Sequence, residues 1–212
     1  MNHIKSHQTQ TGFSLVEMAI VLAIVALLLG SLLPTISGQI EQQRRNETRK
    51  YMDEVRDALL GYAIAHKHLP CPDTNDDGLE NTPCVASQVG TLPYKDLGVT
   101  DKDANGVVLR YAVTAGFADS ATPFTLTTTG TMIVCPSAAT CPATYLTNNA
   151  VAVIISRGAN WATASSADEL ENTNGDTKFV SHDFVQNGFD DLVVWLSPNT
   201  LFNRMVAAGQ LP

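Results

Sequence analysis

Basic side chains are scarce in the last two thirds of the sequence. Residues 69–212 hold six Lys or Arg against fifteen Asp or Glu, a net charge of −9, whereas residues 13–68 hold six of each. Affinity for nucleic acid rests on neutralising phosphates with Lys and Arg, so we expect no nucleic-acid binding by this region. Its acidity instead suits solubility or the binding of calcium.

Recognisable catalytic motifs are also missing. The sequence contains no G-x-S-x-G, no H-E-x-x-H and no glycine-rich phosphate loop, which are patterns typical of hydrolases, zinc proteases and nucleotide enzymes. The histidines at 66, 68 and 182 are scattered, and His66 and His68 would point to different sides of a helix. We therefore expect a structural protein rather than an enzyme.

One long apolar run lies within residues 11–34. From residue 13 to residue 33 every side chain is apolar or small except Ser14, Glu17 and Ser31. About 20 such residues, at ~1.5 Å rise each, span a bilayer core of about 30 Å. A carboxylate inside a membrane helix costs at least ~2.5 kcal/mol and by default marks a functional residue with a partner. The run therefore predicts a membrane helix in which Glu17 has a function.

The order of residues around Glu17 is a polar leader, a glycine, Phe13, three residues, Glu17 and then the apolar run up to Pro34. With the sequence GFSLVE at residues 12–17, this order resembles the class III signal peptide of type IV pilins and type II secretion pseudopilins. The resemblance implies that a prepilin peptidase cuts between Gly12 and Phe13 and methylates the new amine of Phe13. It also implies that Glu17 pairs with the Phe13 amine of a neighbouring subunit, so that neither charge is alone in an apolar bundle.

A plain signal anchor is the other interpretation of the apolar run. An ordinary secretory signal has a basic start, a short apolar region and a small-x-small cleavage site. Here the leader holds one lysine, Lys5, the apolar run is long and no such site follows it. The anchor interpretation also leaves Glu17 without a partner.

The resemblance implies a structural function. We expect a pilin or pseudopilin subunit of a type IV pilus-like filament or a type II secretion pseudopilus, polymerising through its N-terminal helix after cleavage. Its partners would be copies of itself, other pilins and the prepilin peptidase. It would begin as a single-pass precursor in the bacterial inner membrane and end in a periplasmic or extracellular filament. A membrane-anchored periplasmic adhesin or binding module that never polymerises stays open, as does the choice between major and minor subunit.

The patterns divide the chain into a leader of residues 1–12, a transmembrane or filament-core helix of residues 13–34, an amphipathic helix of residues 35–68 and a globular head of residues 69–212. In the amphipathic segment, mainly apolar side chains form a stripe that recurs at spacings of three or four residues with a break of one turn at Arg44, which predicts a helix with one buried face. These side chains are Ile36, Ile40, Thr48, Met52, Val55, Leu59, Tyr62 and Ala63. The Leu69-Pro70 pair is expected to end the helix.

The head is expected to form a small antiparallel sheet. The sequence predicts strands at residues 107–114, 124–130, 131–135, 150–156 and 192–196, and a covering loop at residues 91–99. A short C-terminal helix should begin with Ser197 as N-cap and Pro198 and end near Gly209, with Leu201, Met205 and Ala208 on its docked face. One long helix followed by antiparallel strands is an α+β fold, and the resemblance implies a pilin-like version of it.

Four cysteines are present, without any C-x-x-C pair. In an exported protein they predict two disulfides, for which three connectivities exist. Proximity in the sequence favours Cys71–Cys84 and Cys135–Cys141, and the first would close a loop of about 14 residues, worth ~3 kcal/mol in the chain-entropy model.

Two loops are candidates for calcium. Asp73, Asn75 and Asp77 are followed by Gly78, as in the first half of a calcium-binding loop, but the position of the bidentate glutamate is taken by Cys84. A plain acidic turn is the alternative for this loop.

The second calcium candidate is Asp190 and Asp191, which precede the strand at residues 192–196. The order of strand, glycine turn, acidic loop and aspartates resembles major pseudopilins, in which this loop binds calcium. The resemblance implies that Asp190 and Asp191 are ligands, with carbonyl groups of residues 156–160 closing the site. The loop is longer than in those proteins, and its further acids Asp168, Glu169, Glu171 and Asp176 leave the ligand set open. A turn whose aspartates accept backbone amides is the alternative.

Overall fold

The computed structural model describes most of the chain as two compact units, residues 1–43 and residues 44–212, and each unit is considered by itself. The described residues are 12–84, 88–164, 166–186 and 188–211, without the side chains of residues 31–37. Most of the predicted leader therefore lies outside the described residues. So do the side chains of Pro34 and Ile36.

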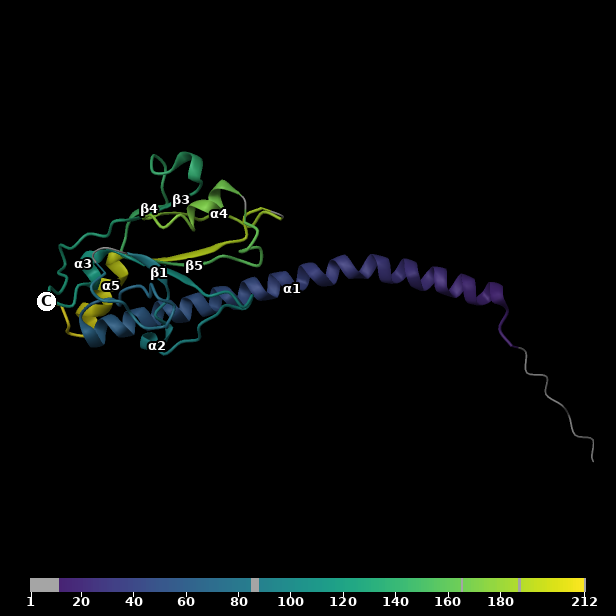
Figure 1. Cartoon of the computed structure of the whole chain (residues 1–212), viewed down its shortest axis with the longest axis horizontal. Coiled ribbons are helices and arrows are strands. Elements are labelled where there is room, and N and C mark those ends of the chain that lie inside the picture. Colours follow the sequence, from purple (N-terminus) through teal and green to yellow (C-terminus); the bar gives the residue numbers. More distant parts are fainter. Residues whose placement is uncertain (1–11, 85–87, 165, 187, 212) are drawn as a thin grey trace, which may run out of the picture. The chain divides into compact units, whose positions relative to one another are not determined.

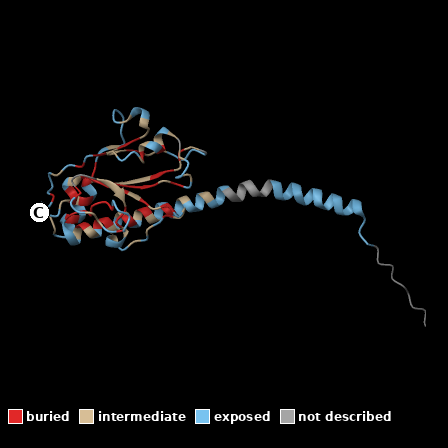
Figure 2. Cartoon of the chain, in the orientation of Figure 1, coloured by how far each residue is buried: buried red, intermediate tan, exposed pale blue. Residues whose placement is uncertain are grey.

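Helix α1 (Leu15–His66) starts in the first unit. Between Phe13 and Ile40 the described apolar side chains of this unit are exposed, as the pale blue part of the helix shows (Figure 2). Among the described residues, no helix combines the length and the hydropathy that a membrane crossing needs.

In the second unit, α1 carries the buried stripe that the sequence predicts. Thr48, Met52, Val55, Leu59 and Ala63 have no exposed surface. The helix ends at His66 rather than near Leu69, because the next residue, Lys67, adopts a left-handed φ of 66°.

The stripe packs against a four-stranded antiparallel sheet, the first sheet. Its strand order is β1 (Val89–Thr91), β2 (Arg110–Val113), β5 (Ala152–Ser156) and β7 (Leu192–Leu196). In the register, Tyr111 faces Ile154 and Ile154 faces Val194. Every residue of β5 is buried, which confirms the prediction of a central strand at its position.

A second sheet has the strand order β4 (Thr147–Ala150), β3 (Met132–Cys135) and β6 (Lys178–Val180). Strand β3 pairs antiparallel with β4 but parallel with β6. A second sheet and a parallel strand pair are not predicted by the sequence. The strands of this sheet are short, and β4 has the sequence TNNA, without the run of β-branched and aromatic residues by which a strand is usually recognised.

The two faces of the first sheet are covered by two separate cores. On one face the sheet packs on the α1 stripe and on Leu201 and Met205 of the C-terminal helix α5 (Pro198–Ala207). On the other face, Val153 and Ile155 of β5 pack on Phe179 and on residues of β3. Figure 1 shows β3, β4 and α4 (Ala167–Glu171) on one side of β5, and α5 on the other.

The C-terminal helix follows the prediction closely. The Ser197 side chain accepts a hydrogen bond from the amide of Thr200, Pro198 is the first helical residue, and Gly209 adopts φ 70°. Leu201 and Met205 are buried as predicted, but Ala208 is exposed.

Three short elements complete the fold: the helices α2 (Tyr94–Leu97) and α3 (Ala115–Ala118) and the 3₁₀ helix η1 (Ala138–Thr140). The predicted covering loop at residues 91–99 contains α2 and the end of β1. The predicted strand at residues 124–130 is wrong, since that segment forms turns in which Thr125 bonds Thr128. The α+β class, with a long N-terminal helix, a sheet and a short C-terminal helix, is confirmed.

Candidate functional site

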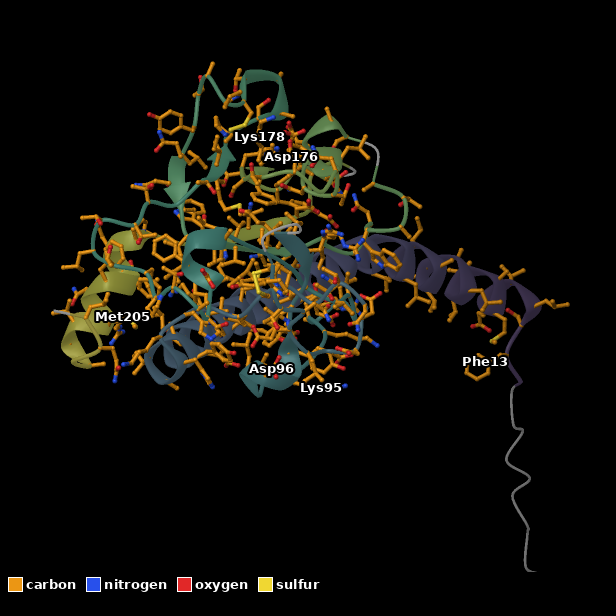
Figure 3. All side chains as sticks on the ribbon, turned by 60° about the vertical axis from the view of Figure 1, so that its left-hand side comes forward. Phe13, Lys95, Asp96, Asp176, Lys178 and Met205 are labelled. Atoms are coloured by element: carbon orange, nitrogen blue, oxygen red, sulfur yellow. A yellow bond between two sulfur atoms is a disulfide. The ribbon has the colours of Figure 1, made fainter. Side chains whose placement is uncertain are left out.

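The residues around the predicted cleavage position form the start of α1. The amide of Ser14 donates to Glu17 Oε2 at 2.9 Å, and the amide of Glu17 donates to Ser14 Oγ at 3.2 Å. This reciprocal pair is a capping box, which satisfies amides that the first helical turn leaves free. Phe13 precedes it and is 85% exposed. Figure 3 labels its side chain just before the start of the helix.

The capping box gives Glu17 a local partner in the single chain. Its carboxylate lies in the first turn, where the positive end of the helix dipole favours a negative charge, and it is exposed. Gly12 and Phe13 are exposed as well, so the predicted scissile bond lies in open chain just before the helix.

A second candidate site lies in the second unit, where three carboxylates converge. Oxygen atoms of Glu169, Asp190 and Asp191 lie within 4.8 Å of one another, and we call these three residues the acidic cluster. Glu169 lies on α4, and the two aspartates directly precede β7.

Asp190 is held by the turn that follows β5. Its Oδ2 accepts the amides of Ala159 at 2.8 Å and Asn160 at 3.2 Å. Gly158 adopts φ 63°, and a Cβ at that position would overlap Asp190 Oδ1. The turn can therefore receive the aspartate only because residue 158 has no side chain.

Glu169 is held at the start of α4 by a capping box of its own. The Ser166 side chain accepts from the amide of Glu169 at 3.2 Å and donates to Glu169 Oε2 at 2.9 Å. The other oxygen, Oε1, accepts from Asn160 Nδ2 at 2.8 Å and from the amide of Asp190 at 3.3 Å.

Asp191 is buried and has a different partner. Its Oδ2 accepts from Asn172 Nδ2 at 2.8 Å. Asn172 also exchanges hydrogen bonds with the backbone of Val180 on β6, so the carboxylate is tied to the second sheet. Burial raises the pKa of Asp191 to about 7.

The pKa values of the other two carboxylates are shifted in opposite directions. Burial raises the pKa of Asp190 against the lowering effect of the Asn160 and Ala159 amides. Burial also acts to raise the pKa of Glu169, but hydrogen bonds from Asn160 and Ser166 outweigh it and hold the pKa below its usual value. The cluster thus contains an acid that stays ionised beside two whose ionisation burial opposes.

Two buried oxygen atoms at the cluster have no hydrogen-bond donor among the residues that the structure describes. They are Asp190 Oδ1 and Asn160 Oδ1. The orientation of the Asn160 amide is fixed by Nδ2, which donates to Glu169 Oε1 and to the Gly188 carbonyl. Its oxygen therefore cannot be exchanged for its nitrogen without losing both bonds. Carboxylate and amide oxygens without donors are what a calcium ion requires, so these residues fit calcium.

The loop of Asp73, Asn75 and Asp77 uses its oxygens within the loop. Asp73 is buried and accepts three backbone amides, from Asn75 at 3.0 Å, Asp76 at 2.8 Å and Gly78 at 2.6 Å. Asn75 Nδ2 donates to Asp77 Oδ2, and the amide of Leu79 donates to Asp77 Oδ1. Among the described residues, the side chains of this loop do not form a group of three or more ligands placed to hold a metal ion. The arrangement is that of the acidic turn.

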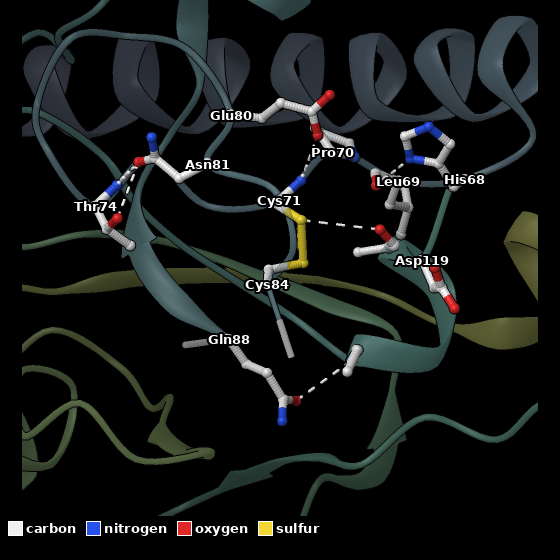
Figure 4. Close-up of a disulfide and its surroundings, with 12 residues drawn as sticks. His68, Leu69, Pro70, Cys71, Thr74, Glu80, Asn81, Cys84, Gln88 and Asp119 are labelled. Carbon is white, nitrogen blue, oxygen red and sulfur yellow. Dashed lines mark hydrogen bonds between the residues drawn. A yellow bond between two sulfur atoms is a disulfide. The ribbon is translucent and has the colours of Figure 1, made fainter. Parts of the chain in front are cut away.

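The four cysteines form the two disulfides that proximity favours, Cys71–Cys84 and Cys135–Cys141. Figure 4 shows the first of them beside Glu80. Glu80 Oε2 accepts the amide of Cys71 at 2.9 Å, and Glu80 Oε1 accepts the hydroxyl of Tyr62 on α1. The disulfide loop is thereby fastened to the buried part of α1.

The acidic cluster contains the two predicted ligands, Asp190 and Asp191, and one of the four further acids of the loop, Glu169. Asn160 and Gly158 belong to the predicted turn after the strand at residues 150–156. The pattern Ser166-x-x-Glu169, a capping-box signature, is a signal that places Glu169 at a helix start. Residues 159 and 160 present amides to Asp190, whereas the resemblance had implied carbonyls of this segment.

Comparison with known proteins identifies one segment of the chain. The family model described as "prokaryotic N-terminal methylation motif" matches residues 7–33. This is the class III signal peptide of type IV pilins and pseudopilins, so the chain has the N-terminus of a pilin-like precursor. No curated protein and no solved structure matches the chain.

Proposed function

We propose that this protein is a subunit of a type IV pilus-like filament or a type II secretion pseudopilus, which polymerises through its N-terminal helix after leader cleavage. The observation that carries the proposal is the N-terminal methylation motif at residues 7–33, within which a helix begins at Leu15. Proteins with this motif are structural, and we assign the chain no catalysis.

The exposed apolar side chains of the first unit support a polymerising role. From Phe13 to Leu29 the exposed large apolar residues are Phe13, Leu15, Val16, Met18, Ile20, Val21, Leu22, Ile24, Val25, Leu27, Leu28 and Leu29. So much apolar surface requires cover by lipid or by other chains. In the proposal, residues 13–34 lie in the membrane before cleavage and in a bundle of like helices afterwards.

Transfer between those two environments needs little hydrophobic free energy, because lipid tails and apolar helices are similarly apolar. Glu17 then favours the bundle over the membrane. Before assembly its carboxylate is satisfied by the Ser14 capping box. After cleavage, the free amine of Phe13 on a neighbouring subunit supplies an opposite charge, and the pair is buried together.

Replacement of Glu17 tests this mechanism. The variant Glu17→Ala should be cleaved between Gly12 and Phe13 like the wild type but should enter sheared filaments at less than about a tenth of the wild-type amount, since an unpaired amine buried in the bundle costs at least ~2.5 kcal/mol. Mass spectrometry of the N-terminal peptide and the yield of filaments are the measurements. Glu41→Ala, an acid later on the same helix, is the matched control. Normal filaments from Glu17→Ala would contradict the mechanism.

A membrane-anchored adhesin or binding module that does not polymerise is the other candidate, and the same N-terminal peptide distinguishes it. An N-terminus that is uncut, or cut elsewhere than after Gly12, would favour the anchored module. A peptide that begins with methylated Phe13 favours the filament subunit.

We also propose that the acidic cluster binds calcium. The support is the pair of donor-free oxygens, Asp190 Oδ1 and Asn160 Oδ1, beside Glu169 and Asp191. Three carboxylates within 4.8 Å repel one another when ionised, and a divalent cation between them would turn that repulsion into attraction.

Thermal unfolding of the mature full-length protein in detergent tests the calcium proposal. Calcium at about 1 mM should raise the unfolding midpoint by about 5 °C relative to EDTA, and magnesium should raise it much less. Asp190→Asn should lose this rise, while Asp183→Asn, an exposed aspartate of the same loop, should keep it. Equal responses of the two variants would overturn the assignment, and would leave the filament proposal untouched.

A further inference from the structure

Two arginines lie close together at one end of the first sheet. Arg110 is the first residue of β2 and pairs in register with Ile155 of β5, and Arg157 follows two residues beyond Ile155. A diagonal pair across neighbouring strands is about 7–8 Å apart between backbones, within reach of long side chains. Both arginines are half-buried.

Neither guanidinium group has an acceptor among the residues that the structure describes. No hydrogen bond or ion pair joins either group to a described residue, and the Nε atoms of both are buried without an acceptor. An arginine carries five N–H donors and is charged at every relevant pH. A half-buried guanidinium without any acceptor is therefore an exception that requires an explanation.

The absence of an acidic partner is the more unusual because acids outnumber bases in this part of the chain. Residues 69–212 hold fifteen acids and six bases, yet two of the six bases adjoin each other instead of pairing with acids. Burial lowers the pKa of Arg110, and the neighbouring charge of Arg157 lowers it further. Two acids interact with the pair electrostatically, Asp76 with Arg110 and Asp191 with Arg157. Each has a hydrogen-bond partner elsewhere, since Asp191 accepts from Asn172 and Asp76 accepts from Thr91.

Arg157 also lies over an aromatic ring. Its Cζ lies 5.1 Å from the centroid of the Trp161 ring. Such a contact uses the face of the guanidinium and leaves its in-plane N–H groups free to donate. Arg157 Nε nevertheless has no acceptor among the described residues.

We propose that Arg110 and Arg157 together bind a single oxyanion group, which accepts N–H donors from both guanidiniums. The planar fork of arginine matches carboxylate and phosphate-type oxygens. One such group removes the repulsion between the two cations and supplies the missing acceptors. A free oxyanion in solution and a carboxylate side chain of a second copy of this chain offer the same chemistry.

The first experiment measures anion binding by the mature full-length protein in detergent. Inorganic phosphate at about 50 mM should raise the unfolding midpoint by about 2–4 °C above sodium chloride of equal ionic strength. Phosphate also stabilises proteins without binding, so the variants decide. Arg110→Gln and Arg157→Gln should lose the specific rise, and Arg204→Gln, an exposed arginine on α5, should keep it.

Lysine variants separate geometry from charge. Arg110→Lys and Arg157→Lys keep the charge but lose the planar fork, so at most half of the specific rise should remain. An equal phosphate response in the wild type and both glutamine variants would overturn the proposal, as would the loss of an equal share of the response in Arg204→Gln.

The second experiment identifies the source of the oxyanion by modification with phenylglyoxal, an arginine reagent, located by mass spectrometry. If the source is free in solution, phosphate should protect Arg110 and Arg157 at least about threefold relative to Arg204, in single chains and in filaments alike. If the source is a second copy, the two arginines should be protected in sheared filaments without phosphate. This second arm alone rests on the proposed function. Absence of protection in every sample would contradict the site.

Discussion

Two groups of acidic side chains lie in the second unit, one in the loop of residues 73–78 and one in the acidic cluster. In the loop, both carboxylate oxygens of Asp73 accept backbone amides from the same loop. In the cluster, Asp190 uses Oδ2 for two amides and leaves Oδ1 buried without a donor. The loop has the spacing of acidic residues that resembles a calcium-binding loop. The cluster, however, has the side-chain oxygens that lack a hydrogen-bond donor among the described residues and so remain available to a cation.

The difference shows that ligand spacing is a weak guide when the residues are close in the sequence. Neighbouring carboxylates and amides readily satisfy each other in Asx turns. The cluster takes Glu169 from α4, Asn160 from the turn after β5 and Asp190 from the segment before β7. Residues so far apart cannot all fold their oxygens back onto local amides, so some oxygens stay available.

Among the substitutions that test this difference, Gly158→Ala should lower the free energy of unfolding the most. The added Cβ would overlap Asp190 Oδ1, and the positive φ is unfavourable as well, so the free energy of unfolding should fall by about 3–4 kcal/mol. The calcium response should vanish at the same time. Gly175→Ala, with φ 86° but open space around its Cβ, is the control and should cost only about 1 kcal/mol. Chemical denaturation of both variants provides the measurement.

Asp73→Ala should destabilise the protein by about 2–3 kcal/mol, because three backbone amides lose their acceptor. The rise in unfolding midpoint on adding calcium should nevertheless match that of the wild type. A variant that loses the calcium response would place the calcium site in the loop and not in the cluster.

Asp191→Asn tests the burial of the cluster through pH. The pKa of Asp191 is about 7 in the folded protein and about 3.9 in an unfolded chain. Between these values the folded state binds more protons, so ionisation of Asp191 makes stability fall as pH rises from about 4 to 7. In EDTA this fall should be larger in the wild type than in Asp191→Asn, by on the order of 2 kcal/mol. Parallel pH profiles would show that Asp191 is not buried as described.

Asn75→Ala should have the smallest effect. Its side chain donates only to Asp77 within an exposed part of the loop, so the free energy of unfolding should change by no more than about 0.5 kcal/mol. Calcium binding should not change. Urea titration with and without calcium is sufficient to check both statements.

Several elements could be predicted from the sequence because their signals are local. The stripe of Met52, Val55 and Leu59 has helical spacing, and Ser197-Pro198 is a helix start by residue type alone. The central strand β5 is an uninterrupted apolar run. The segment at residues 124–130 has the composition of a strand but forms turns, since strand formation also needs a partner strand, which composition does not report.

The second sheet and the arginine pair could not be predicted in the same way. Strand β4 is too polar and β6 too short to be recognised. Both pair with β3, which lies between them, and Phe179 of β6 packs against the first sheet. Nothing in the sequence distinguishes Arg110 and Arg157 from arginines on the surface of a protein. Only the register of β2 with β5 places them side by side.

The sequence by itself determined the N-terminus of this protein: the order of Gly12, Phe13 and Glu17 before an apolar run is the motif, whatever the rest of the chain does. It also determined the buried face of α1, because helical spacing alone assigns that face. The tertiary structure alone decided which acids leave oxygens free and which cations lack partners. These properties depend on distances between residues far apart in the sequence, and such distances are set only when the two cores pack.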